Sequence, residues 1–600
     1  MNRLNTIDYY KIINEEDIRV FVGLFLHAWD DFMEEAKESE NIRPLPPEDD
    51  LSQLSDEKKE LYKKYLFVFP QEEKTAGILT SLLKTILTHG HNIRIYFSGY
   101  YNDRYFRDIY SLYYSKTHYS TDAKCGRFFL FDDSALDKGS EDPRFQLNDA
   151  YIGMIVRRPL SGSEIGRTLI DPIYLHEAKL IKDNKWVLKS NIWRNKYDMT
   201  MFGIPLSVWA FPYSMQDGEV STCAETTVLN INDYYSHRYP DYKRYLPSEI
   251  TQIVSNNSNV RNLPSHGLSY EMVSRVFLEM GFSPILYSAP DFKNRFVEIL
   301  HSYVASGIPV ALGISNDIDH SVGHSVVVIG TSLRLIDAEV DSRKKAFSEA
   351  SVLHLPYSER NTTYYLIQKG AIDSGYIIMD DGKAPYVAVK IYEDNGTAYL
   401  KYDSNDEVWN VSIFAVPMGK DMAMEADAAI EYFRSILVNE VLGYSDFIAR
   451  LKEHITHQEH EFLEAGKSKD NPLLTRVFLC SSKRLKDQRI RHYEKINDDA
   501  TRTAFQRVHL PRFVWVCELY TMKSYCLGVP KCVGEIIIDA SQNPISQDND
   551  ANVVWINYPR RFAFRLLGED IGKLRESMHE PITITNECWY PLTPYEFELH

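Results

Sequence analysis

The sequence predicts a multidomain α+β protein. Its 600 residues are more than one hydrophobic core usually supports. Hydrophobic residues make up 44% and charged residues 25%, as is typical of a folded globular chain. Helical periodicity and short apolar runs gather in separate stretches, which is the α+β pattern. We therefore expect a central domain at 206–415, flanked by two mixed α/β domains at 1–205 and 416–600.

Composition and charge exclude several classes of protein. The net charge of -17 argues against nucleic acid as the main partner, because phosphate binding needs a basic surface. Residues 1–6 lack the apolar stretch of a signal peptide, and no run approaches the roughly 18 apolar residues of a membrane span. The seven cysteines, an odd number, do not suggest a disulfide framework. We expect a cytoplasmic protein with no membrane partner.

The N-terminal segment is expected to mix helices and strands. Apolar residues at helical spacing predict a helix over 17–38, and a second helix is expected at 55–65 after a polar linker. Strands are expected at 93–97, 127–131 and 151–156. None of these elements carries a recognisable catalytic pattern.

The middle segment has the most regular order of helices and strands. Ser221 or Thr222 is expected to cap a helix whose first turn holds Cys223. Ser269 is expected to cap another helix, which ends near Gly281. The elements expected after it are a strand at 283–287, a helix at 292–305, and strands at 309–314, 323–330 and 375–379.

Cys223 and His324 together suggest a nucleophile and its base. The helix N-terminus carries a partial positive charge, which favours the thiolate form of a cysteine placed there. His324 follows about a hundred residues later and leads into a short apolar strand. A cysteine at a helix start with a later histidine at a strand edge is the outline of a thiol nucleophile and general base. His320 ranks below His324, because no predicted strand would fix it.

The middle segment resembles the papain-like cysteine peptidases, and among them the bacterial C39-like branch. The resemblance rests on the cysteine at a helix start, the Gly-Leu-Ser sequence at 267–269, the helix–strand pair before the histidine, and the His-Ser-Val-Val-Val-Ile-Gly run at 324–330. It covers roughly a third of the chain. It implies that Cys223 is the nucleophile, that His324 is the base that becomes an imidazolium, and that a carboxylate orients the imidazole.

Three aspartates compete for that acid role. Asp380 is preferred because it is the first polar residue after an apolar strand, and Asp381 differs from it by one residue of register. Asp337 is the rival, since its distance from the histidine in sequence is closer to the usual one in this family. The choice of Asp380 requires an insertion, for which we propose the polar stretch 341–369.

The resemblance also implies an oxyanion donor. These peptidases use a glutamine upstream of the cysteine, together with the backbone amide of the cysteine itself, and Gln216 is the candidate here. Loss of one such donor typically lowers the rate by about 10²- to 10³-fold. Gln216 stands seven residues before Cys223, where six is usual, and Ala224 replaces the family's common Gly or Trp.

The C-terminal segment is expected to begin with helix and continue with strands. Helical periodicity runs from 423 to 464, with a break near Gly443. Strand-like runs follow at 477–479, 512–516, 535–538 and 553–556.

Other patterns were weighed and carry less chemistry. Three histidines recur every three residues on the expected helix: His454, His457 and His460. Neighbouring pairs of them could bind a transition metal, but a solvated polar face is more common, so no metal or cofactor is expected. The cysteines at 517, 526 and 532 lack zinc spacing, and the glycines of 162–168 lack the spacing of a phosphate-binding loop. The basic residues at 483–491 suggest a solvated helix face or, less often, an anion-binding patch.

The expected function is that of a cysteine peptidase that cleaves a peptide or protein amide through a Cys-His-Asp triad. An acyltransferase would use the same groups. The size of the flanking domains suggests that they restrain or direct the site, with a regulatory partner protein. The alternative is a catalytically inactive adaptor that keeps the papain-like fold in order to bind a peptide or protein.

Overall fold

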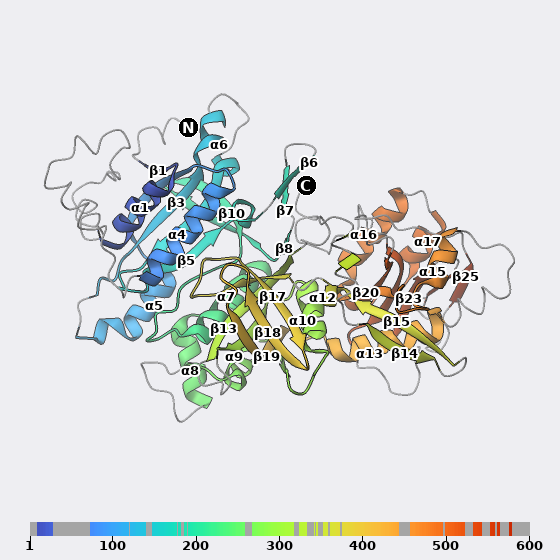
Figure 1. The fold of residues 1–600 in the computed structure, drawn as a ribbon. Coiled ribbons are helices and arrows are strands. Elements are labelled where there is room, and N and C mark those ends of the chain that lie inside the picture. The colour runs from blue at the N-terminus through green and yellow to red at the C-terminus, as the bar shows by residue number, and fades with distance from the viewer. Residues whose placement is uncertain are drawn as a thin grey trace. The chain divides into compact units, whose positions relative to one another are not determined.

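The computed structural model contains both helices and strands, as the α+β prediction requires (Figure 1). It describes residues 9–27, 73–118, 121–139, 147–176, 178–181, 185–188, 190–257, 267–316, 323–332, 341, 344–345, 352–357, 361–372, 375–442, 457–495, 499–522, 532–542, 552–558, 561–564 and 575–578. The chain divides into two compact units, and each of them is assembled from separate segments. The first unit comprises Met1–Leu286, Ala311–Ile329 and Ile377–Ala388, and the second comprises Tyr287–Val310, Gly330–Tyr376 and Val389–His600. The division into three successive domains stays a prediction.

The N-terminal part of the first unit is an antiparallel five-stranded sheet in the order β1–β2–β3–β4–β5. Its strands are β1 (Tyr10–Ile12), β2 (Ile93–Tyr101), β3 (Cys125–Asp132), β4 (Tyr151–Arg157) and β5 (Ile165–Ile170). The three strands predicted in this segment are therefore confirmed, and each extends beyond the predicted residues.

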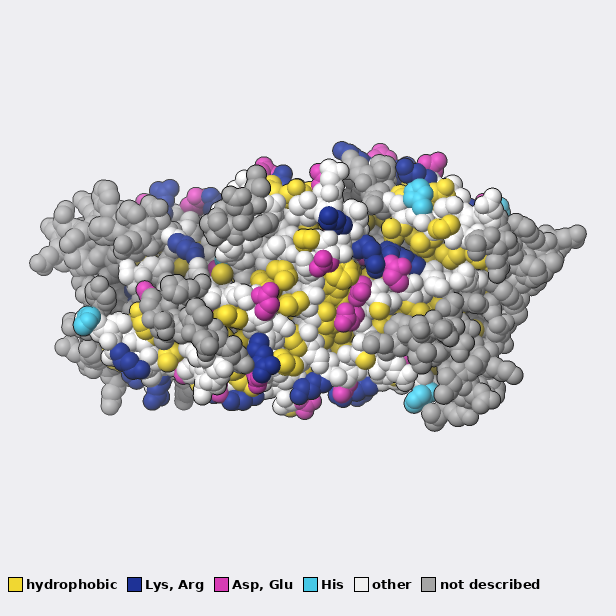
Figure 2. All heavy atoms as spheres, turned by 90° about the horizontal axis from the view of Figure 1, so that it is seen from below, with side chains coloured by type: hydrophobic (Ala, Val, Ile, Leu, Met, Phe, Trp, Pro, Cys, Tyr) yellow, Lys and Arg dark blue, Asp and Glu magenta, His cyan; other side chains and the backbone are white. Residues whose placement is uncertain are grey.

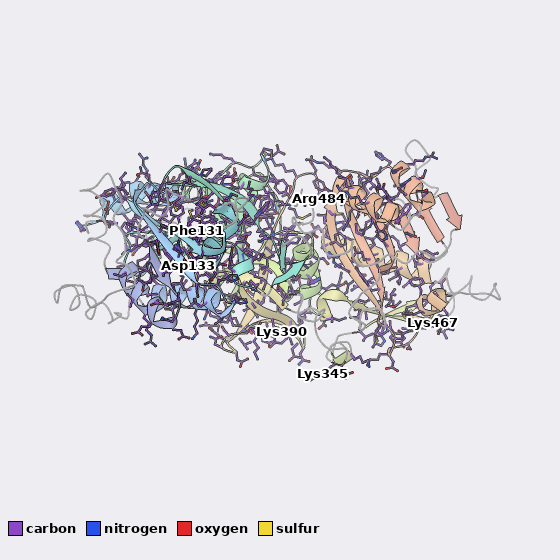
Figure 3. All side chains as sticks on the ribbon, turned by 90° about the horizontal axis from the view of Figure 1, so that it is seen from above. Phe131, Asp133, Lys345, Lys390, Lys467 and Arg484 are labelled. Atoms are coloured by element: carbon purple, nitrogen blue, oxygen red, sulfur yellow. The ribbon has the colours of Figure 1, made fainter. Side chains whose placement is uncertain are left out.

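Aromatic side chains cover both faces of this sheet. On one face α1 (Glu15–His27), which packs against α4 (Glu73–Thr88), places Phe21 and Phe25 on Phe128, with ring centroids 5.5 and 5.1 Å apart. On the opposite face, Phe129 and Phe131 share a core with β9 (Asn195–Met201) and β10 (Ile204–Ala210). Phe131 lies near the end of β3, and Asp133 begins α6 (Asp133–Gly139) (Figure 3).

The predicted helix at 17–38 is confirmed as far as residue 27. Residues 28–38 and the predicted helix at 55–65 lie outside the described residues. Three α-helices among the described residues of this part were not predicted: α4, α5 (Arg104–Leu112) and α6.

The rest of the first unit holds the helices predicted at Cys223 and after Ser269 and the strands predicted at 309–314, 323–330 and 375–379, together with a helix at 247–257 and a strand at 190–192 that were not predicted. Its helices are α7 (Cys223–Arg238), α8 (Pro247–Asn257) and α9 (Tyr270–Glu279). Three of its strands neighbour one another in the order β12 (Val310–Ser315), β13 (Gly323–Ser332) and β16 (Gly375–Met379), and β8 (Ser190–Ile192) pairs with β13. Ser269 caps α9 as predicted, since its hydroxyl accepts the Met272 amide at 3.4 Å.

The second unit is built on a sheet in the order β14–β15–β20–β21–β22–β23–β24–β25. Its strands are β14 (Leu353–Tyr357), β15 (Thr362–Gln368), β20 (Leu473–Ser481), β21 (Phe513–Thr521), β22 (Cys532–Asp539), β23 (Val553–Tyr558), β24 (Arg561–Phe564) and β25 (Arg575–Met578). The four strands predicted after residue 470 are β20 to β23. The polar stretch 341–369 supplies the hairpin β14–β15, and β15 then pairs in parallel with β20.

Two strands, β11 (Ser283–Ser288) and β17 (Val387–Asp394), have residues in both units. The other elements of the second unit are α10 (Phe296–Ala305), α12 (Lys369–Ile372), β18 (Thr397–Tyr402), β19 (Val408–Met418), α13 (Ala426–Ile436), a π-helix (Leu437–Leu442), α15 (His457–Glu464), α16 (Ser482–Lys495) and α17 (Asp499–Arg507). The strands β17, β18 and β19 form an antiparallel meander. Helix is confirmed within the predicted range 423–464, but residues 443–456, with His454 and the predicted break at Gly443, lie outside the described residues.

A network of buried charges lies inside the second unit. Arg489, only 1% exposed, contacts Glu535 at 2.9 Å and Glu518 at 3.4 Å. Arg476 contacts the second oxygen of Glu518 at 2.8 Å. The run 483–491 is therefore neither a uniformly solvated face nor a free basic patch, because one of its arginines is a core residue.

The surface carries mixed charge. On the face drawn in Figure 2, basic and acidic side chains of the described residues are interspersed, with hydrophobic side chains between them. Large hydrophobic side chains that are exposed include Ile13, Tyr239, Leu278 and Val408. Within the described part of the chain, every helix is too short or too polar to cross a membrane.

Candidate active site

Cys223 is the first residue of α7, as predicted. Thr222 is its N-cap and has extended backbone angles, φ -86° and ψ -176°. The Thr222 hydroxyl bonds to the Glu225 carboxylate instead of a helix amide, so it does not cap the helix by its side chain. The preceding loop is held by Asp217, whose Oδ1 accepts the amides of residues 219, 220 and 221 at 2.8, 2.7 and 3.0 Å. Cys223 itself is partly exposed.

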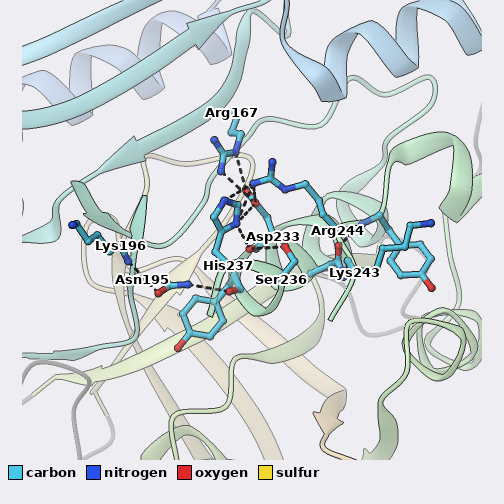
Figure 4. Close-up of polar contacts among 11 residues, drawn as sticks. Arg167, Asn195, Lys196, Asp233, Ser236, His237, Lys243 and Arg244 are labelled. Carbon is cyan, nitrogen blue, oxygen red and sulfur yellow. Dashed lines mark hydrogen bonds and ion pairs between the residues drawn. The ribbon is translucent and has the colours of Figure 1, made fainter. Parts of the chain in front are cut away.

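The C-terminal half of α7 is anchored by a buried aspartate (Figure 4). Asp233 accepts from Arg167 of β5 at 2.7 Å and from Arg244 at 2.6 Å, and His237 lies 3.0 Å away. Burial by itself would raise the pKa of Asp233, but the charge of Arg167, the hydrogen bond of His237 and the charge of Arg244 hold it well below its usual value. The helix that begins at Cys223 is thus fixed to the N-terminal sheet.

His324 is the second residue of β13 and lies against α7. The hydroxyl of Thr227, one turn after Cys223, donates to the carbonyl of Ser325 at 3.2 Å. The Ser325 hydroxyl lies 3.1 Å from that of Tyr270 on α9. These contacts place the start of β13 beside the first turns of α7 and α9, where Cys223 acts on the His324 imidazole.

The strand β16 ends immediately before Asp380, and this aspartate is the partner of His324. The Nε2 atom of His324 lies 2.8 Å from Oδ1 of Asp380 and 3.7 Å from Oδ1 of Asp381. The amide of Gly382 also donates to Oδ1 of Asp380, at 2.8 Å. The geometry therefore brings Asp380 closer to the imidazole than Asp381. Asp337 and His320 lie outside the described residues.

The imidazole of His324 is held in a strongly anionic environment. Burial alone lowers the pKa of His324, but hydrogen bonds to Asp380 and Cys223 and the charges of Asp380 and Asp381 raise it to about 10. An imidazole with this pKa carries a proton at neutral pH. The Nε2 atom faces Asp380, and Cys223 is the other side chain whose hydrogen bonding contributes to the raised pKa of the imidazole.

Asp381 is the unusual residue of the site. Its side chain is 4% exposed, yet neither carboxylate oxygen has a hydrogen-bond donor among the residues that the structure describes. Burial raises the pKa of Asp381 to about 6, against the opposing charge of His324. A buried carboxylate without a donor is costly, because it has lost its hydration and gained little in return.

Gln216 lies in the loop before α7, next to Met215, and is partly buried. Within the described part of the chain no hydrogen bond of its side chain to Cys223 or His324 is seen. Its role as an oxyanion donor stays a prediction.

A metal could in principle be held at the same place. Among the described residues, His324, Asp380 and Asp381 offer ligand atoms that all lie within 4.8 Å of one another. Nitrogen and carboxylate ligands of this kind suit zinc. The 2.8 Å contact between His324 and Asp380 satisfies both groups without an ion, so the set also works as a proton-bound pair.

The other cysteines and histidines singled out in the sequence do not join this site. Burial raises the pKa of the thiol in four other described cysteines: Cys125, Cys480, Cys517 and Cys532. His457 begins α15 and His460 is exposed, both in the second unit, whereas the site lies in the first. Cys526 lies outside the described residues.

Several residues that shape the site were not found by sequence reasoning. Thr227, Ser325 and Tyr270 fix the histidine strand, and Arg158, treated below, holds the loop before Cys223. The sequence around each of these residues has no distinctive motif, and only their hydrogen bonds in the folded chain show that they belong to the site. A comparison with protein-family models finds no match, and a comparison with curated proteins finds none either. The likeness to papain-like peptidases therefore stays a prediction.

Proposed function

We propose that this protein is a cysteine hydrolase of the papain-like kind, acting on a peptide or protein amide. One observation carries the proposal. His324 bonds through Nε2 to Asp380 at 2.8 Å, and the side chain of Cys223, at the start of α7, acts on the same imidazole and helps to raise its pKa. Nucleophile, base and orienting acid thus form one chain of contacts.

The chemistry follows from the contacts. The Cys223 thiolate attacks the substrate carbonyl, and His324 gives its proton to the leaving amine, which leaves a thioester on Cys223. Water, deprotonated by His324, then attacks the thioester and releases the acid. An amine in place of water would make the protein an acyltransferase.

The oxyanion needs donors at the helix start. The amides of the first turn of a helix have no intrahelical acceptor, so the amide of Cys223 is available to the developing negative charge. We assign the second donor to the side chain of Gln216. Its place in the loop before Cys223 supports this assignment.

The test is selective alkylation of the native protein. Iodoacetamide labelling is followed by peptide mass spectrometry between about pH 5 and 9, a range that spans the usual titration of histidine. We expect Cys223 to label at least about tenfold faster near pH 6 than an ordinary exposed thiol, whose thiolate is scarce at that pH. His324→Ala should remove this advantage, and Asp380→Asn should reduce it.

Buried cysteines serve as internal references. Cys517 and Cys532 should stay unlabelled in the folded protein. If Cys223 reacts no faster than an ordinary thiol, or reacts equally in His324→Ala, the catalytic proposal is wrong. The inactive adaptor then becomes the better explanation of the fold.

A further inference from the structure

Arg158, just after β4, reaches from the N-terminal sheet to the loop that leads to Cys223. It is 5% exposed. Its guanidinium donates to the carbonyl of Ser163 at 3.0 and 2.7 Å and to the carbonyl of Met215 at 3.1 Å. Met215 is the residue before Gln216. One fork of donors therefore ties a turn of the N-terminal sheet to the loop of the proposed oxyanion donor.

The same loop is paired to the N-terminal sheet by its backbone. Tyr213 and Thr168 exchange two hydrogen bonds, of 3.1 and 2.7 Å, and the Met215 amide donates to Ile165 at 3.1 Å. Gly166 lies between these partners. A Cβ at this position would lie 3.0 Å from Cγ of Arg158, so a larger residue would crowd the arginine side chain. The loop therefore lies alongside β5 and is hydrogen-bonded to it.

Lys74, in the first turn of α4, lies beside the aspartate turn of the site. A Cβ placed on Gly382 would be 3.3 Å from Oδ1 of Asp380 and 3.6 Å from Nζ of Lys74. The next residue of α4, Thr75, donates to the buried carboxylate of Glu164 at 2.5 Å, which fixes the start of the helix. The exposed ammonium group of Lys74 therefore lies near the Asp380–Gly382 turn.

Three cations counteract the effect of burial on the carboxylate of Asp381. The groups that act on its carboxylate are His324, Asp380, Lys74 and Arg158, and the Tyr213 hydroxyl also feels its charge. Burial is the largest influence and raises the pKa of Asp381, while His324, Lys74 and Arg158 oppose that rise. Two of these three cations come from the N-terminal part of the chain.

We propose that Arg158 and Lys74 are positioning residues of the Cys223–His324 site. Arg158 fixes the loop before Cys223, and Lys74 balances the charge of the Asp380–Asp381 pair. The N-terminal part of the chain then completes the active site instead of forming a detachable regulatory module. This inference rests on the proposed function.

The first test uses the full-length protein and charge variants of Lys74. We measure the pH profile of iodoacetamide labelling at Cys223. Removal of a nearby cation makes every proton harder to lose, so Lys74→Met should move the whole profile upward by about half a pH unit. Lys74→Arg should restore it, and about 1 M salt should shrink the difference. A merely structural lysine would show neither the restoration nor the salt effect.

The second test separates Arg158 from its neighbour Arg157. Arg157 is equally buried, but its shortest hydrogen bonds go to carbonyls at the end of α1, at 2.5 Å to Phe25 and 3.0 Å to Leu26, and a longer one goes to the backbone carbonyl of Arg158 at 3.4 Å. Acylation by p-nitrophenyl acetate needs the oxyanion donors, whereas alkylation by iodoacetamide does not. Arg158→Lys should slow acylation about tenfold and leave alkylation nearly unchanged, because a displaced loop weakens an oxyanion contact. Arg157→Lys should change neither the rate of acylation nor the rate of alkylation.

The outcomes distinguish the two proposals. If the unmodified protein lacks fast, His324-dependent labelling, the proposed function fails. If that labelling is present, but Lys74→Met and Arg158→Lys both behave like Arg157→Lys, the proposed function stands and this inference is overturned. Melting temperatures of all variants exclude an effect of unfolding.

Discussion

The candidate site and the charged network of the second unit are both buried, yet they treat carboxylates differently. In the network, Arg489 and Arg476 occupy both oxygens of Glu518. Glu535 bonds to Arg489 through one oxygen and to the Tyr493 hydroxyl through the other. In the site, Asp380 has donors, but within the described part of the chain neither oxygen of Asp381 has one.

The difference shows that buried charge alone does not mark a functional site. The network contains two arginines and two glutamates, so its charges cancel and its carboxylates are satisfied. Such networks organise a core. The site instead places two carboxylates beside one imidazole, and their charges help to raise the pKa of His324 to about 10. Perturbed pKa values of this kind are expected at functional sites.

The largest effect should come from breaking the network. Glu518→Gln removes the charge that pairs with Arg476 and Arg489, and it leaves two buried arginines short of a partner. We expect a loss of about 3–5 kcal/mol in the stability of the second unit, measured by urea denaturation. Labelling of Cys223 should not change in the folded variant. A loss below about 1 kcal/mol would show that the network is dispensable.

A smaller loss of stability is expected from a substitution of Asp233. This residue is buried and hydrogen-bonded, and it anchors α7, the helix that begins at Cys223. Its pKa lies below the usual value, so its contribution is present above the unfolded pKa of about 4 and is lost as the pH falls further. Asp233→Asn should lower stability by about 2–3 kcal/mol at neutral pH. The difference from the unmodified protein should shrink below about pH 4. Melting temperatures across this range test both statements, and a difference independent of pH would contradict them.

The smallest effect, with the opposite sign, is expected at Asp381. Its pKa is raised to about 6, so the folded state binds this proton more tightly than the unfolded state does. Ionisation of Asp381 therefore destabilises the fold as the pH rises from about 4 to 6, and the full cost is present above that range. Asp381→Asn should stabilise the protein by about 1–2 kcal/mol at pH 8 and change little at pH 4.

The same variant, Asp381→Asn, also tests the electrostatic effect of Asp381 on His324. Without the Asp381 charge, the pKa of His324 should fall, and the alkaline limb of Cys223 labelling should move downward. Destabilisation by Asp381→Asn at high pH would mean that Asp381 has a partner in solution, and the contrast with the network would then disappear.

Local pattern was sufficient to locate the candidate nucleophile and base. The cap at Thr222, the apolar run after His324 and the strand before Asp380 all occur where they were expected. Each depends on short-range rules of helix capping and strand patterning, which a sequence displays directly. The choice between Asp380 and Asp381 could not be made in this way, because one residue of register reverses the side chain.

Arg489 shows where local pattern misleads. It stands in a basic run that reads as a solvated helix face, but it is 1% exposed. Its partners lie 29 and 46 residues later, on β21 and β22. Charge patterning on one helix contains no information about acidic residues on distant strands.

The sequence by itself determined the α+β character of the chain, most of the elements around Cys223 and the identity of the candidate pair, because these depend on neighbours within a few residues. Only the tertiary structure decided which aspartate meets His324, that Asp381 is buried with no hydrogen-bond donor among the described residues, and that Arg158 and Lys74 approach the site from the N-terminal part. These features depend on contacts between residues far apart in sequence. Such contacts form only when burial brings the elements together and forces each polar group either to find a partner or to remain unsatisfied.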